Sequence, residues 1–79
     1  MIRALFFGPV AESVGARRID VPYRAGITWQ DVRDELRSRH PEAFALVSIV
    51  AVDGERVVDA GPPLADGAEI VFMSRFSGG

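Results

Sequence analysis

The sequence ends in Gly78 and Gly79, and this pair offers the clearest opportunity for chemistry in the chain. Because glycine has no Cβ, an extended Gly-Gly can enter a slot that any side chain would block. The α-carboxylate of Gly79 is ionised at neutral pH and is a poor electrophile until it is activated. Adenylation by ATP would supply a leaving group, after which a sulfur or an amine could attack the carbonyl carbon. The alternative interpretation is a frayed end or a cloning remnant without function.

The composition excludes most other reactive groups. The 79 residues contain no cysteine, and their nine basic residues are all arginine. The chain therefore has no lysine for a phosphate-binding loop or a Schiff base, and no thiolate for nucleophilic attack or a zinc site. The single histidine, His40, cannot supply a set of metal ligands, and we interpret it as a helix-terminal cation or an exposed polar residue rather than a catalytic group. We expect no metal site and no bound cofactor.

Length and charge place the chain among small folded domains. With 48% hydrophobic residues, 25% charged residues and a net charge of −2, it is neither a disordered tail nor a membrane span. No basic face for nucleic acid is expected, and the first residues have the character of neither a secretion signal nor a membrane anchor. We expect a cytoplasmic protein that binds neither nucleic acid nor a membrane. Its core is too small to enclose an active site, so the chemistry belongs at the surface or at an end.

Hydrophobic periodicity predicts one main helix over residues 27–40. Thr28 can cap its start, Asp31 stands at the third helical position, and Pro41 should end it. Three residues form its apolar stripe: Trp29, Val32 and Leu36. We expect this stripe to lie on a sheet with Trp29 inside, and the alternative is an exposed Trp29 that stacks on a ligand.

Five short segments have strand character: 1–7, 16–22, 47–52, 57–58 and 69–73. Between the first two, residues 10–15 could form a turn of helix that Gly15 stops. The order predicts an α+β roll of the β-grasp type, with a mixed sheet of four or five strands and one main helix on one face. The first and last strands should lie side by side and parallel at the sheet centre. We expect the folded domain at 1–74 and a flexible tail at 75–79.

Alternation along the two central strands predicts an apolar patch on the sheet face away from the helix. Arg3 in the first strand and Glu69 in the last should face water. The two-residue period brings four apolar side chains to that same face: Leu5, Phe7, Val71 and Met73. Such a patch on a small protein is typical of a partner-binding surface. The alternative is that one of the four is out of register or is covered by a loop.

Several stretches of the sequence, taken together, are similar to a known family. They are the opening Ile2-Arg3-Ala4-Leu5-Phe6-Phe7-Gly8, the following Ala11-Glu12-Ser13-Val14-Gly15, the helix start from Thr28 to Leu36, Leu64-Ala65-Asp66-Gly67-Ala68-Glu69-Ile70, and the closing Gly78-Gly79. With this length and this ending, the chain resembles the small sulfur-carrier subunits of molybdopterin synthase, the MoaD-like members of the ubiquitin-like β-grasp proteins.

The resemblance implies a function for the tail. An adenylyltransferase related to the ubiquitin-activating class would use ATP to adenylate Gly79, and a sulfur relay protein would convert it to a thiocarboxylate. The tail would then enter the large subunit of molybdopterin synthase and give its sulfur to cyclic pyranopterin monophosphate, forming the dithiolene of molybdopterin. The residues that would insert are Arg75, Phe76, Ser77 and Gly78. The chain would not be catalytic alone, and Phe7 with the outer face of the last strand would form the docking surface.

Other functions remain open on the sequence. The chain could serve another thiolation pathway, such as that of thiamine, cysteine or tRNA, or it could be a ubiquitin-like modifier joined through Gly79 to lysines of other proteins. A plain binding module with an inert tail is a further alternative. The sequence also departs from the resembled family, because Ser74 and Arg75 stand where many members have Pro-Pro, and Ala68 stands where they often have aspartate. The first change makes the base of the tail more flexible and adds a charge.

Overall fold

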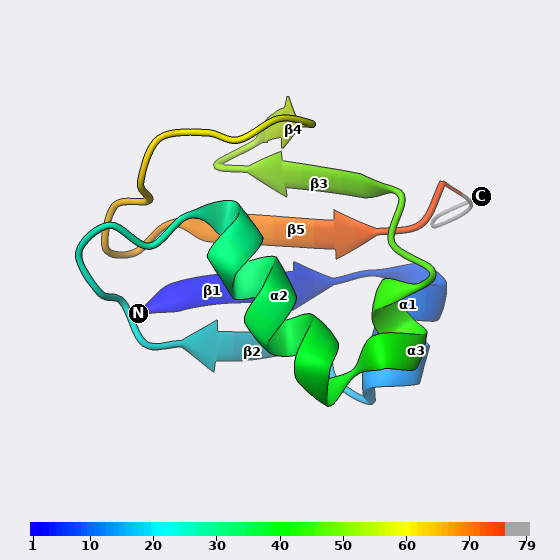
Figure 1. Ribbon diagram of the computed structural model, residues 1–79. Coiled ribbons are helices and arrows are strands. Elements are labelled where there is room, and N and C mark those ends of the chain that lie inside the picture. Colours follow the sequence, from blue (N-terminus) through cyan, green and yellow to red (C-terminus); the bar gives the residue numbers. More distant parts are fainter. Residues whose placement is uncertain (76–79) are drawn as a thin grey trace.

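The first and last strands of the chain form the centre of the sheet. The computed structural model describes residues 1–75, and in it β1 (Ile2–Phe6) runs parallel to β5 (Glu69–Met73) (Figure 1). Three further strands complete the order β2-β1-β5-β3-β4: β2 (Arg18–Val21), β3 (Ile49–Val52) and β4 (Glu55–Val57). The other three strand pairs are antiparallel. The predicted mixed sheet and its parallel centre are therefore confirmed.

The main helix, α2 (Trp29–Arg39), begins with a reciprocal capping box. The Oγ1 atom of Thr28 accepts a hydrogen bond from the backbone N–H of Asp31 at 3.2 Å, and the Asp31 carboxylate accepts one from the N–H of Thr28 at 3.0 Å. The bond from the Thr28 backbone is the main reason why the pKa of Asp31 lies below its usual value. Because the folded-state pKa of Asp31 is lowered, the stability that its ionised carboxylate adds is complete at neutral pH. This stability is lost as the pH falls through the folded-state pKa.

Replacement of Thr28 by alanine should destabilise the fold by about 1 kcal/mol, because the N–H of Asp31 then loses its acceptor at the start of the helix. Urea-induced unfolding followed by circular dichroism measures this loss. The matched control is Thr28→Ser, which retains the oxygen and should unfold close to the native midpoint. Equal losses in both variants would show that the methyl group contributes and not the hydroxyl.

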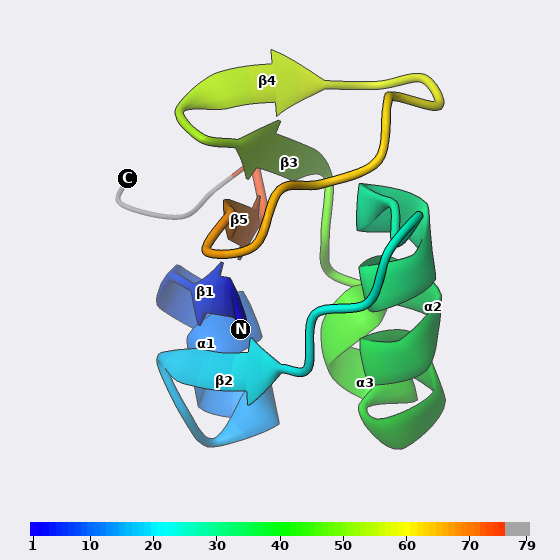
Figure 2. The same ribbon diagram turned by 90° about the vertical axis from the view of Figure 1, so that its left-hand side faces the viewer.

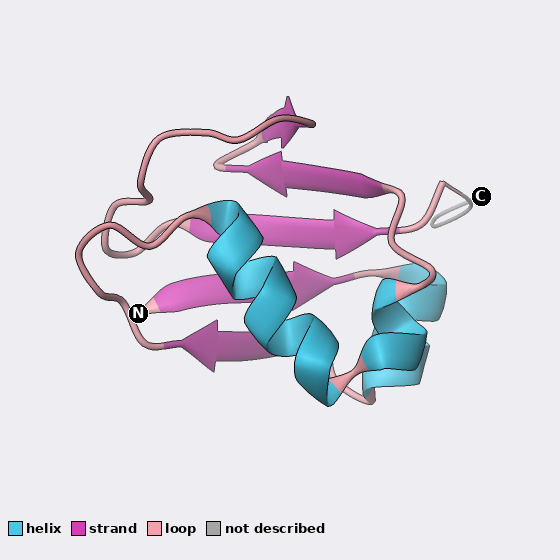
Figure 3. Ribbon diagram, viewed as in Figure 1, coloured by secondary structure: helices cyan, strands magenta, loops and turns pink. Residues whose placement is uncertain are grey.

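Two short helices, α1 (Gly8–Val14) and α3 (Pro41–Phe44), pack together at one end of the sheet (Figure 3). Helix α1 starts earlier than the predicted turn, and it ends as predicted at Gly15, whose φ is 84° and whose N–H donates to the carbonyl of Ala11 at 2.8 Å. Helix α3 is not predicted by the sequence pattern. Pro41 follows the end of α2 but also begins α3, because a proline has no N–H that the first turn of a helix would leave unsatisfied.

Helices α2 and α3 lie on one face of the sheet and bury it (Figure 2). The residues that meet there without exposed surface are Ile2, Ala4, Val32, Leu36, Ile70 and Phe72. Trp29 is 5% exposed, and its Nε1–H donates to the carbonyl of Asp59 at 3.1 Å. Trp29 is therefore a core residue whose polar atom is satisfied, and the interpretation of an exposed ring that stacks on a ligand is wrong.

Candidate functional site

The predicted docking patch, defined as Leu5, Phe7, Val71 and Met73, lies on the sheet face that α2 and α3 leave uncovered (Figure 2). Leu5 is the register partner of Val71 across the parallel centre, so the two share a face. Along β1 and β5 the inward residues are buried and the outward ones are half-buried. Phe7 follows β1 with an extended backbone and is 49% exposed. The register of the patch is as predicted, and its role in binding stays a prediction.

Strand β3 adds two residues to this face. Ile49 is the register partner of Met73 and Ala51 is the register partner of Val71, and both are half-buried. The sequence pattern did not include them, because it does not state which strand lies beside β5. The run of β-branched residues at 47–52 is the signal that could have found them.

An arginine stands on each side of the docking patch and the two β3 residues that adjoin it. In β2, Arg18 is the register partner of Leu5, and in β4, Arg56 is the register partner of Ala51. Both arginines are exposed. A protein that binds this face would therefore meet an apolar centre with an arginine on either side, and the guanidinium of Arg18 is already paired with Asp20.

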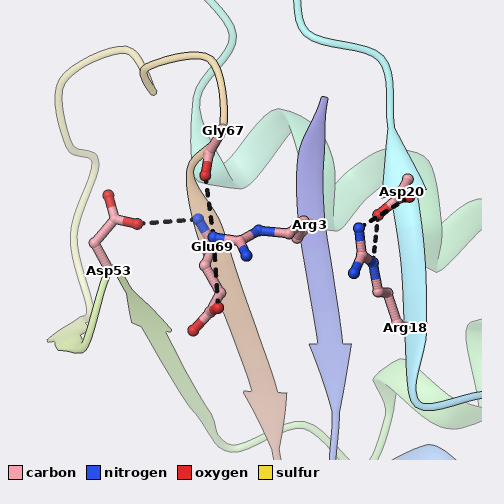
Figure 4. A network of polar contacts seen from close by, with 6 residues as sticks. All are labelled: Arg3, Arg18, Asp20, Asp53, Gly67 and Glu69. Atoms are coloured by element: carbon pink, nitrogen blue, oxygen red, sulfur yellow. Dashed lines mark hydrogen bonds and ion pairs between the residues drawn. The ribbon is translucent and has the colours of Figure 1, made fainter.

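The other end of the same face is charged (Figure 4). A guanidinium nitrogen of Arg3 lies 3.7 Å from the Glu69 carboxylate and donates to the carbonyl of Gly67 at 3.3 Å. The Nε–H of Arg18 donates to the Asp20 carboxylate at 2.7 Å, and this bond holds the pKa of Asp20 below its usual value. Strands β1 and β5 both start at this end. The docking patch therefore lies toward the opposite end, where β5 finishes and the C-terminal tail begins.

The tail begins at the edge of the folded body. Ser74 is 6% exposed, and the carbonyl of Met73 accepts a hydrogen bond from the N–H of Ser48 at 3.0 Å. Arg75 is exposed and is the last residue that the structure describes. The remaining predicted tail residues lie outside the described residues: Phe76, Ser77, Gly78 and Gly79. Four residues can span at most about 14 Å, which bounds the distance between Arg75 and residue 79.

His40 lies at the junction of α2 and α3, where its N–H donates to the carbonyl of Leu36 at 2.9 Å. Among residues 1–75, no three His, Cys, Asp or Glu side chains are grouped closely enough to hold a metal ion. In the same range, no helix combines the length and apolar character that crossing a bilayer requires.

A protein family and several solved structures are similar to this chain. The ThiS family model matches residues 4–79. SAMP1 from Haloferax volcanii has a similar structure, with a TM-score of 0.79 and 26% identity over 99% of this chain and 98% of SAMP1. A second structure, H. volcanii small archaeal modifier protein 1, gives a TM-score of 0.75 and 25% identity over 92% of this chain and 94% of the other. No curated protein matches significantly. The chain belongs to the ThiS family, and its ubiquitin-like β-grasp fold is that of sulfur carriers and protein modifiers.

Proposed function

We propose that the chain is a sulfur carrier whose C-terminal Gly79 is converted to a thiocarboxylate. The observation that carries this proposal is the family match through residue 79, where the sequence has Gly78 and Gly79. Two further features support it. The chain has no cysteine, so transferable sulfur must be held on the terminal carboxyl. The docking patch lies at the end of the sheet where the tail begins, so a bound partner can receive the tail.

The chemistry has two steps. First, the Gly79 carboxylate attacks the α-phosphorus of ATP on an activating enzyme, pyrophosphate leaves, and an acyl adenylate forms. Second, a sulfur nucleophile attacks the carbonyl carbon, a C–S bond forms, and AMP leaves with the electrons of the broken C–O bond. With hydrosulfide as the nucleophile, loss of its proton gives the thiocarboxylate. Any lysine or cysteine in this sequence of steps belongs to the partners, because this chain has neither.

The test is intact-mass measurement of the full chain after incubation with an activating enzyme, ATP and sulfide. The expected product is heavier by the difference between one sulfur and one oxygen atom, and it should be absent when ATP is omitted. An unchanged mass in the complete reaction would overturn the carrier proposal.

For the destination of the sulfur, we propose the large subunit of molybdopterin synthase in the cytoplasm, with cyclic pyranopterin monophosphate as the acceptor. The sequence resemblance to the small subunits of that enzyme supports this choice. The alternative destinations are the thiolation pathways of thiamine, cysteine and tRNA. Molybdopterin should form when thiocarboxylate-loaded chain, the large subunit and the pyranopterin are mixed. A loaded chain that yields no molybdopterin would exclude this destination and leave the carrier chemistry intact.

The similarity to SAMP1 favours one second candidate, a protein modifier. That protein is described as a small archaeal modifier protein, and the match covers 99% of the present chain. In this role a lysine amine would displace AMP from Gly79 and form an isopeptide bond. Because the chain has no lysine, it could not form side-chain-linked chains on itself. Peptides carrying a Gly-Gly remnant on the lysines of other proteins would support the modifier, and a thiocarboxylate without such peptides would support the carrier.

Replacement of Phe7 by alanine should weaken docking and leave the fold nearly intact. The Phe7 side chain is 49% exposed, so truncation should cost about 1 kcal/mol or less in unfolding free energy. An aromatic anchor at the centre of an interface is worth about 2 kcal/mol or more, or roughly 30-fold in Kd. Calorimetric titration of the large subunit of molybdopterin synthase measures the change in Kd, and urea unfolding measures the change in stability.

The matched control for Phe7 is Tyr23→Ala, which truncates another exposed aromatic outside the docking patch and should leave Kd unchanged. Similar losses of affinity in both variants would contradict a docking role for Phe7. A large loss of stability in the Phe7 variant would place that side chain in the core.

A further inference from the structure

The helix-covered face of the molecule has an open groove beside β4. Figures 1 and 2 both show α2 alongside β5, β1 and β2, while β4 stands clear of it. The groove has a volume of about 340 Å³. The lining residues that matter here are Trp29, Arg33, Arg37, Phe44, Val57 and Val58. Val58 is 73% exposed, so the apolar lining extends to the surface.

The strand that borders the groove has a free edge. Strand β4 is the last in the sheet order, so among residues 1–75 no strand pairs with its outer side. Backbone N–H and C=O groups on such an edge can pair with an added strand from another protein. The hydrogen bond from Trp29 Nε1–H to the carbonyl of Asp59 ties the start of α2 to the segment after β4. This bond holds the helix and the strand edge together, so the groove is formed before any ligand arrives.

The groove also carries local positive charge. The Arg33 and Arg37 guanidinium groups both donate to the same oxygen, Oδ1 of Asp34, at 3.1 and 3.0 Å. Two cations therefore share one carboxylate, and one positive charge is left without a counterpart in this trio. The Arg33 guanidinium also lies 5.2 Å from the centre of the Trp29 ring. Since the whole chain has a net charge of −2, this positive charge is a local feature of the groove and not a general one.

From the free edge, the apolar lining and the unbalanced charge, we propose that the groove binds an extended segment of a partner protein in which a short apolar run is flanked by acidic residues. The segment adds to β4 as a further strand. Its apolar side chains pack on Val57 and Val58 at the open side of the groove, and its carboxylates lie toward Arg33 and Arg37. The groove and the docking patch lie on opposite faces of the sheet, so one protein can hold the chain here while another uses its tail.

The test is an NMR titration of the full ¹⁵N-labelled chain with an acetylated and amidated peptide of sequence Glu-Glu-Val-Ile-Val-Glu-Glu. The control peptide has lysine in place of each glutamate. We expect shifts of the Trp29 indole N–H signal and of the β4 amides, and binding of the acidic peptide at least about tenfold tighter than that of the lysine peptide. Added salt should weaken the binding.

Three variants test which residues of the groove contribute to peptide binding. The double variant Arg33→Gln/Arg37→Gln should bind the acidic peptide roughly fivefold more weakly, as expected for two partly exposed ion pairs. Its control, Arg24→Gln/Arg39→Gln, removes the same charge from arginines that pair with a different carboxylate and should bind normally. Val58→Asp changes an exposed position, so the protein should fold and lose binding. Equal binding of the two peptides, shifts confined to the opposite sheet face, or no shifts at millimolar peptide would overturn the proposal.

Discussion

Deletion of Gly79 should abolish thiocarboxylate formation and leave the melting temperature of the protein unchanged. The carboxylate must meet the α-phosphorus of ATP at bonding distance, and loss of one residue withdraws it by about 3.4 Å. A misplacement of about 1 Å at a reacting centre can cost roughly 100-fold in rate, so we expect a loss of at least that size. Folding should be unaffected, because among residues 1–75 the buried hydrophobic residues lie between Ile2 and Phe72.

Two companion variants separate the position of the carboxylate from the width of the tail. Addition of one alanine after Gly79 moves the carboxylate outward and should be as damaging as the deletion. Gly79→Ala keeps the length and adds only a methyl group, so any loss in this variant reports how narrow the partner's slot is. Intact-mass measurement with ATP and sulfide follows all three. A shortened chain that acquires sulfur at the native rate would contradict the mechanism, because the position of the carboxylate would then not matter.

Local signals made the helix and the central strands predictable. The capping box requires an acceptor at Thr28 and a carboxylate three residues later, and this spacing alone places the start of α2. Alternation in β1 and β5 assigned Leu5 and Val71 to the outer face, because each strand carries a charged residue that must face water. These features depend on neighbours within a few residues, so a single sequence contains them.

The parallel pairing of β1 and β5 was predicted from the β-grasp order of the elements, but other features that depend on distant pairings could not be predicted. Ile49 and Ala51 join the outer face only because β3 lies beside β5, and the order of the elements does not state this. Pro41 carries an ambiguous signal, since the same residue type ends one helix and begins the next. The groove beside β4 depends on where α2 lies across the sheet. Tertiary packing determines that position, and no local sequence signal reports it. The tail chemistry, in contrast, is a prediction from the type and position of Gly78 and Gly79 together with the resemblance to sulfur-carrier subunits.

Replacement of Phe72 by alanine should destabilise the protein by about 3–5 kcal/mol. Phe72 has no exposed surface. Its ring stacks on Phe6 at 5.9 Å and meets the edge of Phe44 at 5.0 Å between ring centres, so it joins β5, β1 and α3. A chain of this length has a total stability of about 4–12 kcal/mol, so truncation removes a large part of it. Urea unfolding at neutral pH measures the loss.

The comparison with the next position in the strand tests the assignment of the two sheet faces. Phe72→Leu keeps most of the volume and should cost less than the alanine change. Met73→Ala, on the outer face, should cost much less than Phe72→Ala in stability but should weaken docking, because Met73 is only half-buried in the free chain. If the Met73 variant were the less stable of the two alanine variants, the face assigned to docking would be the core. The partner that is proposed to receive the tail would then have no apolar surface on which to dock.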